Sequence, residues 1–232
     1  MVKNSLSLKL GLALNSSPSS TWSPLLESTL EAWWKLKAGV TTVADDKVSE
    51  WSDSSTNSHN MLQETDAERP VYDSSSGSIT FDSGNTNHLE SGSQISLSGN
   101  FTIAFWFHPT SYNNSVIGDN TTAGEFVKLT GTDEMKIKID GSDDDLTLDT
   151  GTVWGNNYIV LTRDGTRIDI WHNGTQQSSQ ITLSGTVDID ALGVRKTDLN
   201  PYNGKMYDIQ VYSSTSSILT TNLLNYYKGI YE

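Results

Sequence analysis

Apolar and polar residues alternate along much of this chain, most clearly over residues 158–174. In the first of two runs Ile159 and Leu161 point to one side, and in the second Ile168 and Ile170 do so, with mostly polar or long side chains between them. An Asp-Gly pair separates the runs and an Asn-Gly pair closes the second, and both pairs are typical of tight turns. This pattern predicts a β-hairpin with one buried face.

Short alternating runs recur on both sides of this hairpin. The strongest covers residues 101–109, and others lie at residues 30–36, 47–53, 78–82, 125–129, 135–140, 146–148, 181–183 and 202–212. The tail at residues 219–229 instead has leucines and tyrosines at helical spacing, threonine N-cap candidates and a glycine stop. Strands joined by turns, with one terminal helix, predict an all-β fold: a two-sheet antiparallel jelly-roll sandwich with a short C-terminal helix. The adjacent Trp33 and Trp34 should face opposite sides of their strand.

The first 20 residues form a separate segment in this interpretation, followed by one jelly-roll domain over residues 21–232. Within the first 20 residues, leucines alternate with other residues, which is the period of an extended strand with one apolar edge. A polar stretch rich in serine follows as a flexible linker. The segment is therefore either an assembly arm that docks on a partner or sister subunit, or an edge strand of the sandwich itself. Its leucines are Leu6, Leu8, Leu10, Leu12 and Leu14.

The charge balance excludes some classes of partner. With 15 basic and 28 acidic residues, the formal net charge of −13 disfavours nucleic acid, which binds cationic surfaces. The chain has no cysteine, so disulfides, thiolate metal sites and a cysteine nucleophile are excluded. Lys9 and several serines interrupt the apolar character of the first residues, and no run is long enough to span a membrane. We therefore expect a protein made in the cytoplasm, not exported by a signal of its own, and not inserted in a membrane.

Four segments in order carry a family resemblance: Trp51 with Asp53, then residues 101–109, 158–174 and 202–212. Together they resemble the laminin-G-like, concanavalin A-like jelly-roll domains of the lectin/glucanase superfamily, of the type found in tailed-phage virion proteins. The resemblance implies the same fold that the alternation predicts. Fold alone does not give function.

Catalysis has no support in the sequence. The β-glucanases that share this architecture use Glu-x-Asp-x-Glu on one strand, because retaining chemistry needs two carboxylates about 5 Å apart, and that spacing is absent. The acidic cluster at residues 140–146 falls in an expected turn, where carboxylates are solvated. The four histidines, His59, His88, His108 and His172, are scattered without zinc-ligand spacing. We therefore expect a protein that is not an enzyme.

Calcium and a glycan are the two ligands that remain. Relatives carry calcium in rim loops, and the resemblance implies Asp82, Asn85 and Asn87 as its ligands, although asparagine in place of aspartate lowers the ligand charge. No cofactor is required, and calcium stays open. A glycan needs aromatic faces with amide groups beside them. The loop residues with that chemistry are Tyr112, Asn113, Asn114, Trp154, Asn156 and Tyr202. The alternative is that these aromatic residues pack the sandwich or a subunit contact.

The resemblance and the leucine-rich segment together predict a virion structural protein. It would be displayed on the particle surface, as capsid decoration or as a fibre or tail appendage, after synthesis in the host cytoplasm. Its expected partners are other virion proteins, further copies of itself in a closed oligomer such as a trimer, and cell-surface polysaccharide. The alternatives are a free bacterial carbohydrate-binding lectin and, last, a β-glucanase-type hydrolase.

Overall fold

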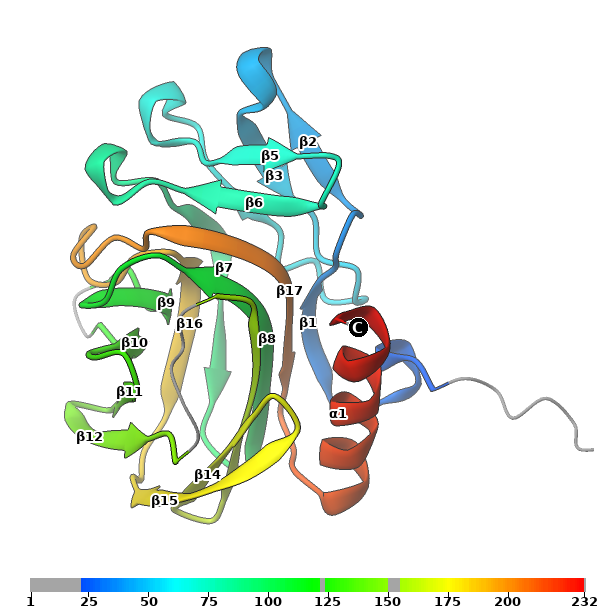
Figure 1. Cartoon of the computed structure of the whole chain (residues 1–232), viewed down its shortest axis with the longest axis vertical. Coiled ribbons are helices and arrows are strands. Elements are labelled where there is room, and N and C mark those ends of the chain that lie inside the picture. The colour runs from blue at the N-terminus through cyan, green and yellow to red at the C-terminus, as the bar shows by residue number, and fades with distance from the viewer. Residues whose placement is uncertain (1–21, 122–123, 150–154, 232) are drawn as a thin grey trace, which may run out of the picture.

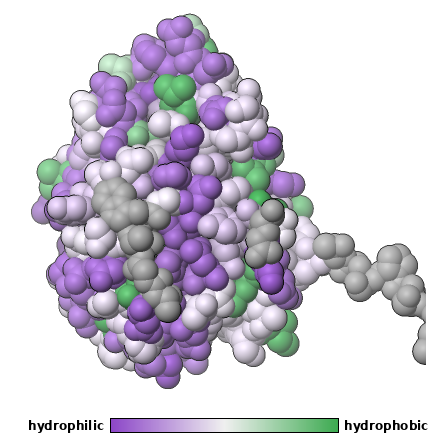
Figure 2. All heavy atoms as spheres, in the orientation of Figure 1, coloured by the Kyte–Doolittle hydropathy of each residue, from purple (hydrophilic) through white to green (hydrophobic). Residues whose placement is uncertain are grey.

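The computed structural model describes residues 22–121, 124–149 and 155–231, and it confirms the predicted two-sheet antiparallel sandwich with one C-terminal helix (Figure 1). The leucine-rich segment and Trp154 lie outside the described residues. Within the described part of the chain, no helix combines the length and apolar composition that a membrane crossing needs. On the face shown in Figure 2, hydrophilic residues predominate and hydrophobic ones are scattered in small groups.

The strands form two sheets. Sheet A has the order β15 (Thr175–Thr182), β14 (Arg167–His172), β13 (Asn157–Asp164), β8 (Phe101–Pro109), β17 (Gly204–Tyr212), β6 (Ser78–Phe81) and β5 (Val71–Asp73), and β1 (Leu30–Trp34) also pairs with β17. Sheet B has the order β12 (Ser142–Thr147), β11 (Glu134–Ile139), β10 (Phe126–Leu129), β9 (Asn114–Gly118), β16 (Val187–Leu192), β7 (Leu89–Leu97), β4 (Met61–Leu62), β3 (Val48–Trp51) and β2 (Val40–Thr42). Short 3₁₀ helices lie at Pro24–Leu26, Ala44–Asp46, Asp66–Glu68 and Ser83–Asn85, and the helix α1 covers Ser217–Tyr231.

The predicted hairpin is β13 and β14, joined by a two-residue turn. Its four apolar residues, Ile159, Leu161, Ile168 and Ile170, all lie in the main core between the sheets, as their alternation requires. The expectation of one buried face was wrong, because Tyr158 and other residues of the opposite face are buried in a second apolar cluster. The sequence pattern underestimated how much of sheet A is covered.

The helix α1 provides that cover. It packs on the outer face of sheet A, beside β1 and β17 in Figure 1, and buries Leu219, Leu223 and Tyr227 there. The Ser216 hydroxyl caps its first turn by accepting from the Leu219 amide at 3.0 Å. The predicted boundaries need correction, since no threonine is the cap and the helix continues through Gly229.

The two tryptophans divide between the clusters as predicted. Trp34 faces the main core, and Trp33 lies in the cluster under α1. The Trp33 indole nitrogen donates to Asp208 at 3.1 Å, and the hydroxyl of Tyr227 from α1 donates to the same carboxylate at 3.1 Å. Burial raises the pKa of Asp208, although the donors around it favour its charged form. Asp208 thus connects β1, β17 and the helix as a structural group.

Arg163 closes one end of the sandwich. Its side chain is almost fully buried and lies over the Phe101 ring at 4.7 Å. The guanidinium donates to the carbonyls of Leu97 (3.0 Å), Gly185 (2.8 Å) and Gly99. One side chain therefore satisfies backbone acceptors of two separate loops.

The acidic cluster near residue 140 differs from its prediction. Only Asp140 and Gly141 form the turn, both at positive φ, while the next acidic residues belong to β12 at the edge of sheet B. Lys136 of β11 pairs across the strands with Asp143 at 2.9 Å and Asp145 at 3.2 Å. These carboxylates are partners in a cross-strand ion pair.

Candidate functional site

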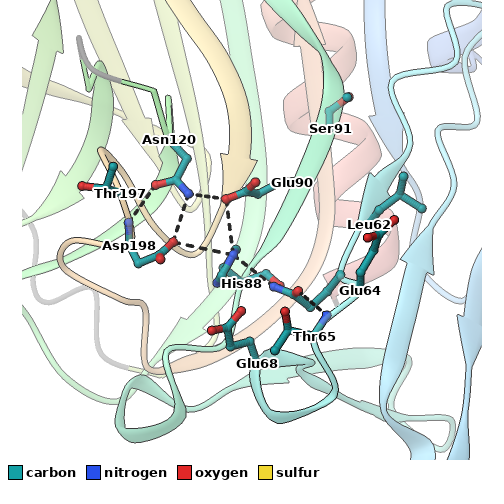
Figure 3. Close-up of a pocket in the computed structure, with 12 residues that line it drawn as sticks. Leu62, Glu64, Thr65, Glu68, His88, Glu90, Ser91, Asn120, Thr197 and Asp198 are labelled. Atoms are coloured by element: carbon teal, nitrogen blue, oxygen red, sulfur yellow. Dashed lines mark hydrogen bonds and ion pairs between the residues drawn. The ribbon is translucent and has the colours of Figure 1, made fainter.

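A polar pocket of about 510 Å³ opens on sheet B, where β4 and β7 meet two loops (Figure 3). One loop follows β9, and the other joins β16 to β17. Apart from Leu62 and Gly92, every lining residue carries a polar side chain, and none is lysine or arginine. The lining residues are Leu62, Gln63, Glu64, Thr65, Glu68, His88, Glu90, Ser91, Gly92, Asn120, Thr197 and Asp198.

Strand alternation brings two of these side chains together. Leu89 points into the main core, so its neighbours His88 and Glu90 both face outward into the pocket. The His88 ring is buried, with 6% of its side chain exposed, whereas 43% of the Glu90 side chain is exposed. Their near atoms, His88 Nε2 and Glu90 Oε1, are 3.3 Å apart.

Asp198 reaches the same point from the loop between β16 and β17. Three consecutive residues of that loop, Lys196, Thr197 and Asp198, have left-handed φ values of 40°, 53° and 63°. The Asn120 side chain holds Asp198 by accepting from its amide at 2.9 Å and donating to its carboxylate at 3.0 Å, and it also donates to Glu90. Asp198 Oδ1 thereby lies 3.7 Å from His88 Nε2, as the dashed lines in Figure 3 trace.

The hydrogen bonds of His88 define its tautomer. Its Nδ1 lies 2.8 Å from the Thr86 carbonyl, which only accepts, so Nδ1 carries a proton. On the other side, Gln63 Oε1 accepts from the Thr65 amide at 2.9 Å, which turns Gln63 Nε2 toward His88 Nε2 at 3.0 Å. Because Gln63 Nε2 only donates, the single lone pair of Nε2 in neutral His88 accepts from Gln63, whereas the protonated Nε2 of charged His88 donates to Glu90.

The charges in the pocket influence one another. Burial opposes protonation of His88, but the Glu90 carboxylate, the Thr86 carbonyl and Asp198 outweigh it and raise the His88 pKa. The hydrogen bond with His88 in turn lowers the Glu90 pKa, against the effect of burial. The pocket favours a positive charge at the point where these groups meet.

A second group of carboxylates lies beside the pocket. Asp190 accepts from the Asn120 amide at 2.7 Å, and burial, together with the charges of Asp119 and Glu90, raises its pKa to about 6. Burial also raises the pKa of Glu125, which is 3% exposed. Burial opposes ionisation of Asp119 as well, yet donors on Thr121 and Gly124 outweigh it and lower its pKa. Asp119 is thus the member of this group that ionises most readily.

The predicted glycan residues are only partly suited to their role. Tyr112 is exposed, and Asn113 has a φ of 66° in the turn after β8. Asn156, opposite the end of β8, is hydrogen-bonded to His108 at 3.1 Å. These three residues lie at one end of sheet A and do not line the pocket.

Two other members of that set are buried. Tyr202 is completely enclosed, its ring 5.9 Å from that of Phe81, so the structure does not support sugar contact there. Asn114 is 3% exposed and donates to the Ser111 hydroxyl at 2.6 Å. Their chain neighbours suggested loops, but the strands and the core enclose both side chains.

The predicted calcium ligands lie together in one turn. Asp82 accepts from the Gly84 amide at 2.8 Å and from the Asn85 side chain at 2.9 Å. The Asn87 side chain accepts from the Asp82 amide at 3.0 Å and is buried. The oxygens of Asp82 and Asn87 therefore already serve the turn, and Asp82 supplies the one negative charge, so the three residues fit calcium poorly. Calcium at this turn stays a prediction.

Sequence reasoning missed the pocket. His88 and Glu90 form a His-x-Glu pair, which places both side chains on one face of a strand, and that signal was available. Asn120 and Asp198 are distant in sequence, and only the pairing of β16 with β7 and β9 brings their loops to the pair.

Comparison with known proteins identifies the family. The model of the concanavalin A-like lectin/glucanases superfamily matches residues 82–217, well over half of the chain. A search of curated proteins with this chain found no match.

Three solved structures illustrate the similarity. Domain 4 of AbnA, a GH43 extracellular arabinanase from Geobacillus stearothermophilus in complex with arabinotriose, is 13% identical with a TM-score of 0.60, over 85% of this chain and 97% of that one. The Trypanosoma rangeli sialidase in complex with sialic acid is 12% identical with a TM-score of 0.55, over 89% of this chain but 34% of its own length. The Ruminococcus gnavus sialidase CBM40 bound to α2,3-sialyllactose is 19% identical with a TM-score of 0.43, over 55% of this chain and 82% of that one. At these identities the likeness concerns the fold. On the family match, the chain belongs to the concanavalin A-like lectin/glucanases superfamily.

Proposed function

We propose that this protein is a non-enzymatic carbohydrate-binding module and that the His88 pocket takes the sugar. The observation that carries the proposal is the polar lining of the pocket, with carboxylate, amide and hydroxyl groups open to solvent. Such groups pair with the hydroxyls of a sugar ring and fix its orientation. The arabinotriose complex of the arabinanase domain supports this function for the fold.

The charge of the pocket favours a neutral sugar. Glu64, Glu68, Glu90 and Asp198 all line it, without lysine or arginine among the lining residues. An anionic sugar such as sialic acid would meet like charges, which disfavours binding. We therefore expect preference for neutral glycans over sialylated ones.

Hydrolysis is the less favoured use of the same pocket. Glu90 and Asp198 bring carboxylate oxygens within 4.8 Å, close to the roughly 5 Å separation of retaining glycosidases. The Asn120 amide nitrogen, however, donates to both carboxylates, and its hydrogen bond helps to lower the Glu90 pKa. Retaining hydrolysis needs one carboxylic acid that stays protonated, so this arrangement disfavours it. Release of new reducing ends from laminarin by the full chain would establish the glucanase and overturn a purely binding role.

Binding is tested by isothermal titration of the full chain with arabinotriose and with sialyllactose. We expect the neutral sugar to bind, and Asn120→Ala to weaken it at least tenfold. Tyr112→Ala is the matched control, because Tyr112 is exposed at a different place. If the Tyr112 variant lost sugar binding and the Asn120 variant bound the sugar unchanged, the sugar site would instead lie at the end of sheet A. Failure of every neutral glycan on an array would overturn the proposal.

We also propose that the module is displayed on a virion surface, with residues 1–20 as its assembly arm and sister copies of the chain as partners. The alternating leucines of that segment support the idea, since an apolar strand edge needs a cover. Deleting residues 1–20 should abolish incorporation into particles and leave the sandwich folded. Unchanged incorporation, measured by mass spectrometry of purified particles, would refute the arm.

A further inference from the structure

We propose that His88, Glu90 and Asp198 form a binding site for a divalent transition-metal cation of the zinc type. One ligand atom from each of the three residues lies within 4.8 Å of the other two. The site concerns the metal alone, so it stands or falls separately from sugar binding.

The spacing of the ligand atoms fits such a cation. Zinc binds nitrogen and oxygen at about 2.0–2.2 Å, so neighbouring ligand atoms of a tetrahedral site lie about 3.4 Å apart. His88 Nε2 is 3.3 Å from Glu90 Oε1 and 3.7 Å from Asp198 Oδ1. The Glu90 and Asp198 oxygens lie within 4.8 Å of each other, so these two side chains must draw together around the cation.

The surroundings of His88 orient it as a metal ligand. Its Nδ1–H donates to the Thr86 carbonyl at 2.8 Å, the usual arrangement of a metal-binding histidine, whose second nitrogen is fixed by a backbone acceptor. Two carboxylates lie beside Nε2, so three ligand groups meet at one point. Without metal, the Nε2 lone pair accepts from Gln63 Nε2 at 3.0 Å, and a bound cation replaces that contact. A cation at that point also removes the mutual repulsion of the ligand groups.

Asn120 positions the two carboxylates. Its side-chain nitrogen donates to both Glu90 and Asp198, and its oxygen accepts from the Asp198 amide at 2.9 Å. A carboxylate oxygen has further lone pairs, so the same atoms can still bind a metal. Asn120 thus acts as a support for the ligands.

The ligand atoms, one imidazole nitrogen and two carboxylate oxygens, determine which metals the site would prefer. Calcium and magnesium prefer sites built from oxygen alone, and calcium takes six to eight ligands. One imidazole with two carboxylates suits zinc, cobalt or nickel. Three protein ligands leave a fourth position open on such a cation, and all three residues line the 510 Å³ pocket. Water, or a hydroxyl of a bound sugar, would fill that position.

The test is isothermal titration of EDTA-treated full-length protein with zinc chloride, and with calcium chloride as a second titrant. We expect one zinc site with a micromolar Kd and at least tenfold weaker calcium binding. Asp198→Asn should weaken zinc binding at least tenfold, and because 47% of this side chain is exposed, the variant should fold. His88→Gln should abolish it. His108→Gln, which changes a histidine outside the pocket, is the matched control and should bind as the unchanged protein does.

A second readout identifies the ligands directly. Cobalt bound by the three residues should give visible absorption bands of a low-coordinate site, and these should disappear in the His88 variant. Equal zinc affinity in the unchanged, His88→Gln and Asp198→Asn proteins would overturn the site, as would loss of binding in the His108 variant alone. If zinc binds and no sugar does, the cation site stands and the proposed carbohydrate function fails.

Discussion

The raised pKa of Asp190 predicts how the free energy of unfolding of this protein depends on pH. The pKa of Asp190 is raised from 3.8 to about 6 by burial and by the charges of Asp119 and Glu90. A group whose folded-state pKa is raised binds its proton more tightly in the folded than in the unfolded chain. Asp190 therefore stabilises the fold when it is protonated at low pH, and that contribution is lost as the pH rises from about 4 to above 6.

The magnitude follows from the shift. Each pKa unit corresponds to about 1.4 kcal/mol, so the full shift sets a ceiling near 3 kcal/mol. Asp190 is only partly buried and titrates together with Asp119, so we expect about 1–2 kcal/mol. Asp190→Asn removes the charge and keeps an oxygen that accepts from the Asn120 amide. The variant should be more stable than the unchanged protein by this amount at pH 7.5 and nearly equal to it at about pH 3, below the pKa of the unfolded chain.

Urea denaturation followed by tryptophan fluorescence measures both values, since Trp34 and Trp51 are buried and report unfolding. The measurements need EDTA in the buffer, so that no metal screens Glu90. Asp188→Asn is the control, because Asp188 lies two positions away on the same strand and accepts from the Ser96 hydroxyl at 2.6 Å instead of from Asn120. Equal effects of Asp190→Asn at the two pH values would show that its pKa is not raised and would refute the reasoning.

Three further predictions concern stability and are checked by the same urea assay. Arg163→Met should cost about 2 kcal/mol, because it leaves the buried contact at the Leu97 carbonyl and the part-buried contacts at Gly99 and Gly185 without a donor; a loss under 1 kcal/mol would contradict this. Leu223→Ala should cost about 3 kcal/mol by leaving a cavity under α1, whereas Ile218→Ala, on the exposed side of the helix, should cost less than about 0.5 kcal/mol. Gly174→Ala should cost more than Gly165→Ala, since both have positive φ but only the former would place its Cβ 2.9 Å from a tyrosine hydroxyl; equal losses would argue against that contact.

The fold was predictable because its main signals are local. Alternation along a strand, the Asn-Gly turn and the helical spacing of the tail each need only a few neighbouring residues. The errors arose where a distant element changes the surroundings. The alternation placed Tyr158 on the exposed face of its strand, but α1, about 60 residues later in the sequence, covers that face. The neighbours of Tyr202 suggested a loop residue, but its side chain is buried in the core.

The pocket depends on contacts of the opposite kind, which explains why its members were missed. Within it, only His88 and Glu90 are close enough in sequence for strand geometry to place them together. Asp198 follows 108 positions after Glu90, on a loop whose left-handed residues have no recognisable glycine signal. Its position depends on Asn120, and Asn120 depends on Asp190, so the site is built from a chain of polar contacts between three loops and strands. Hydrophobic periodicity predicts which residues form strands and which face the core, but it carries no information about polar contacts between distant loops. The sandwich could therefore be predicted from the sequence, whereas the pocket could not.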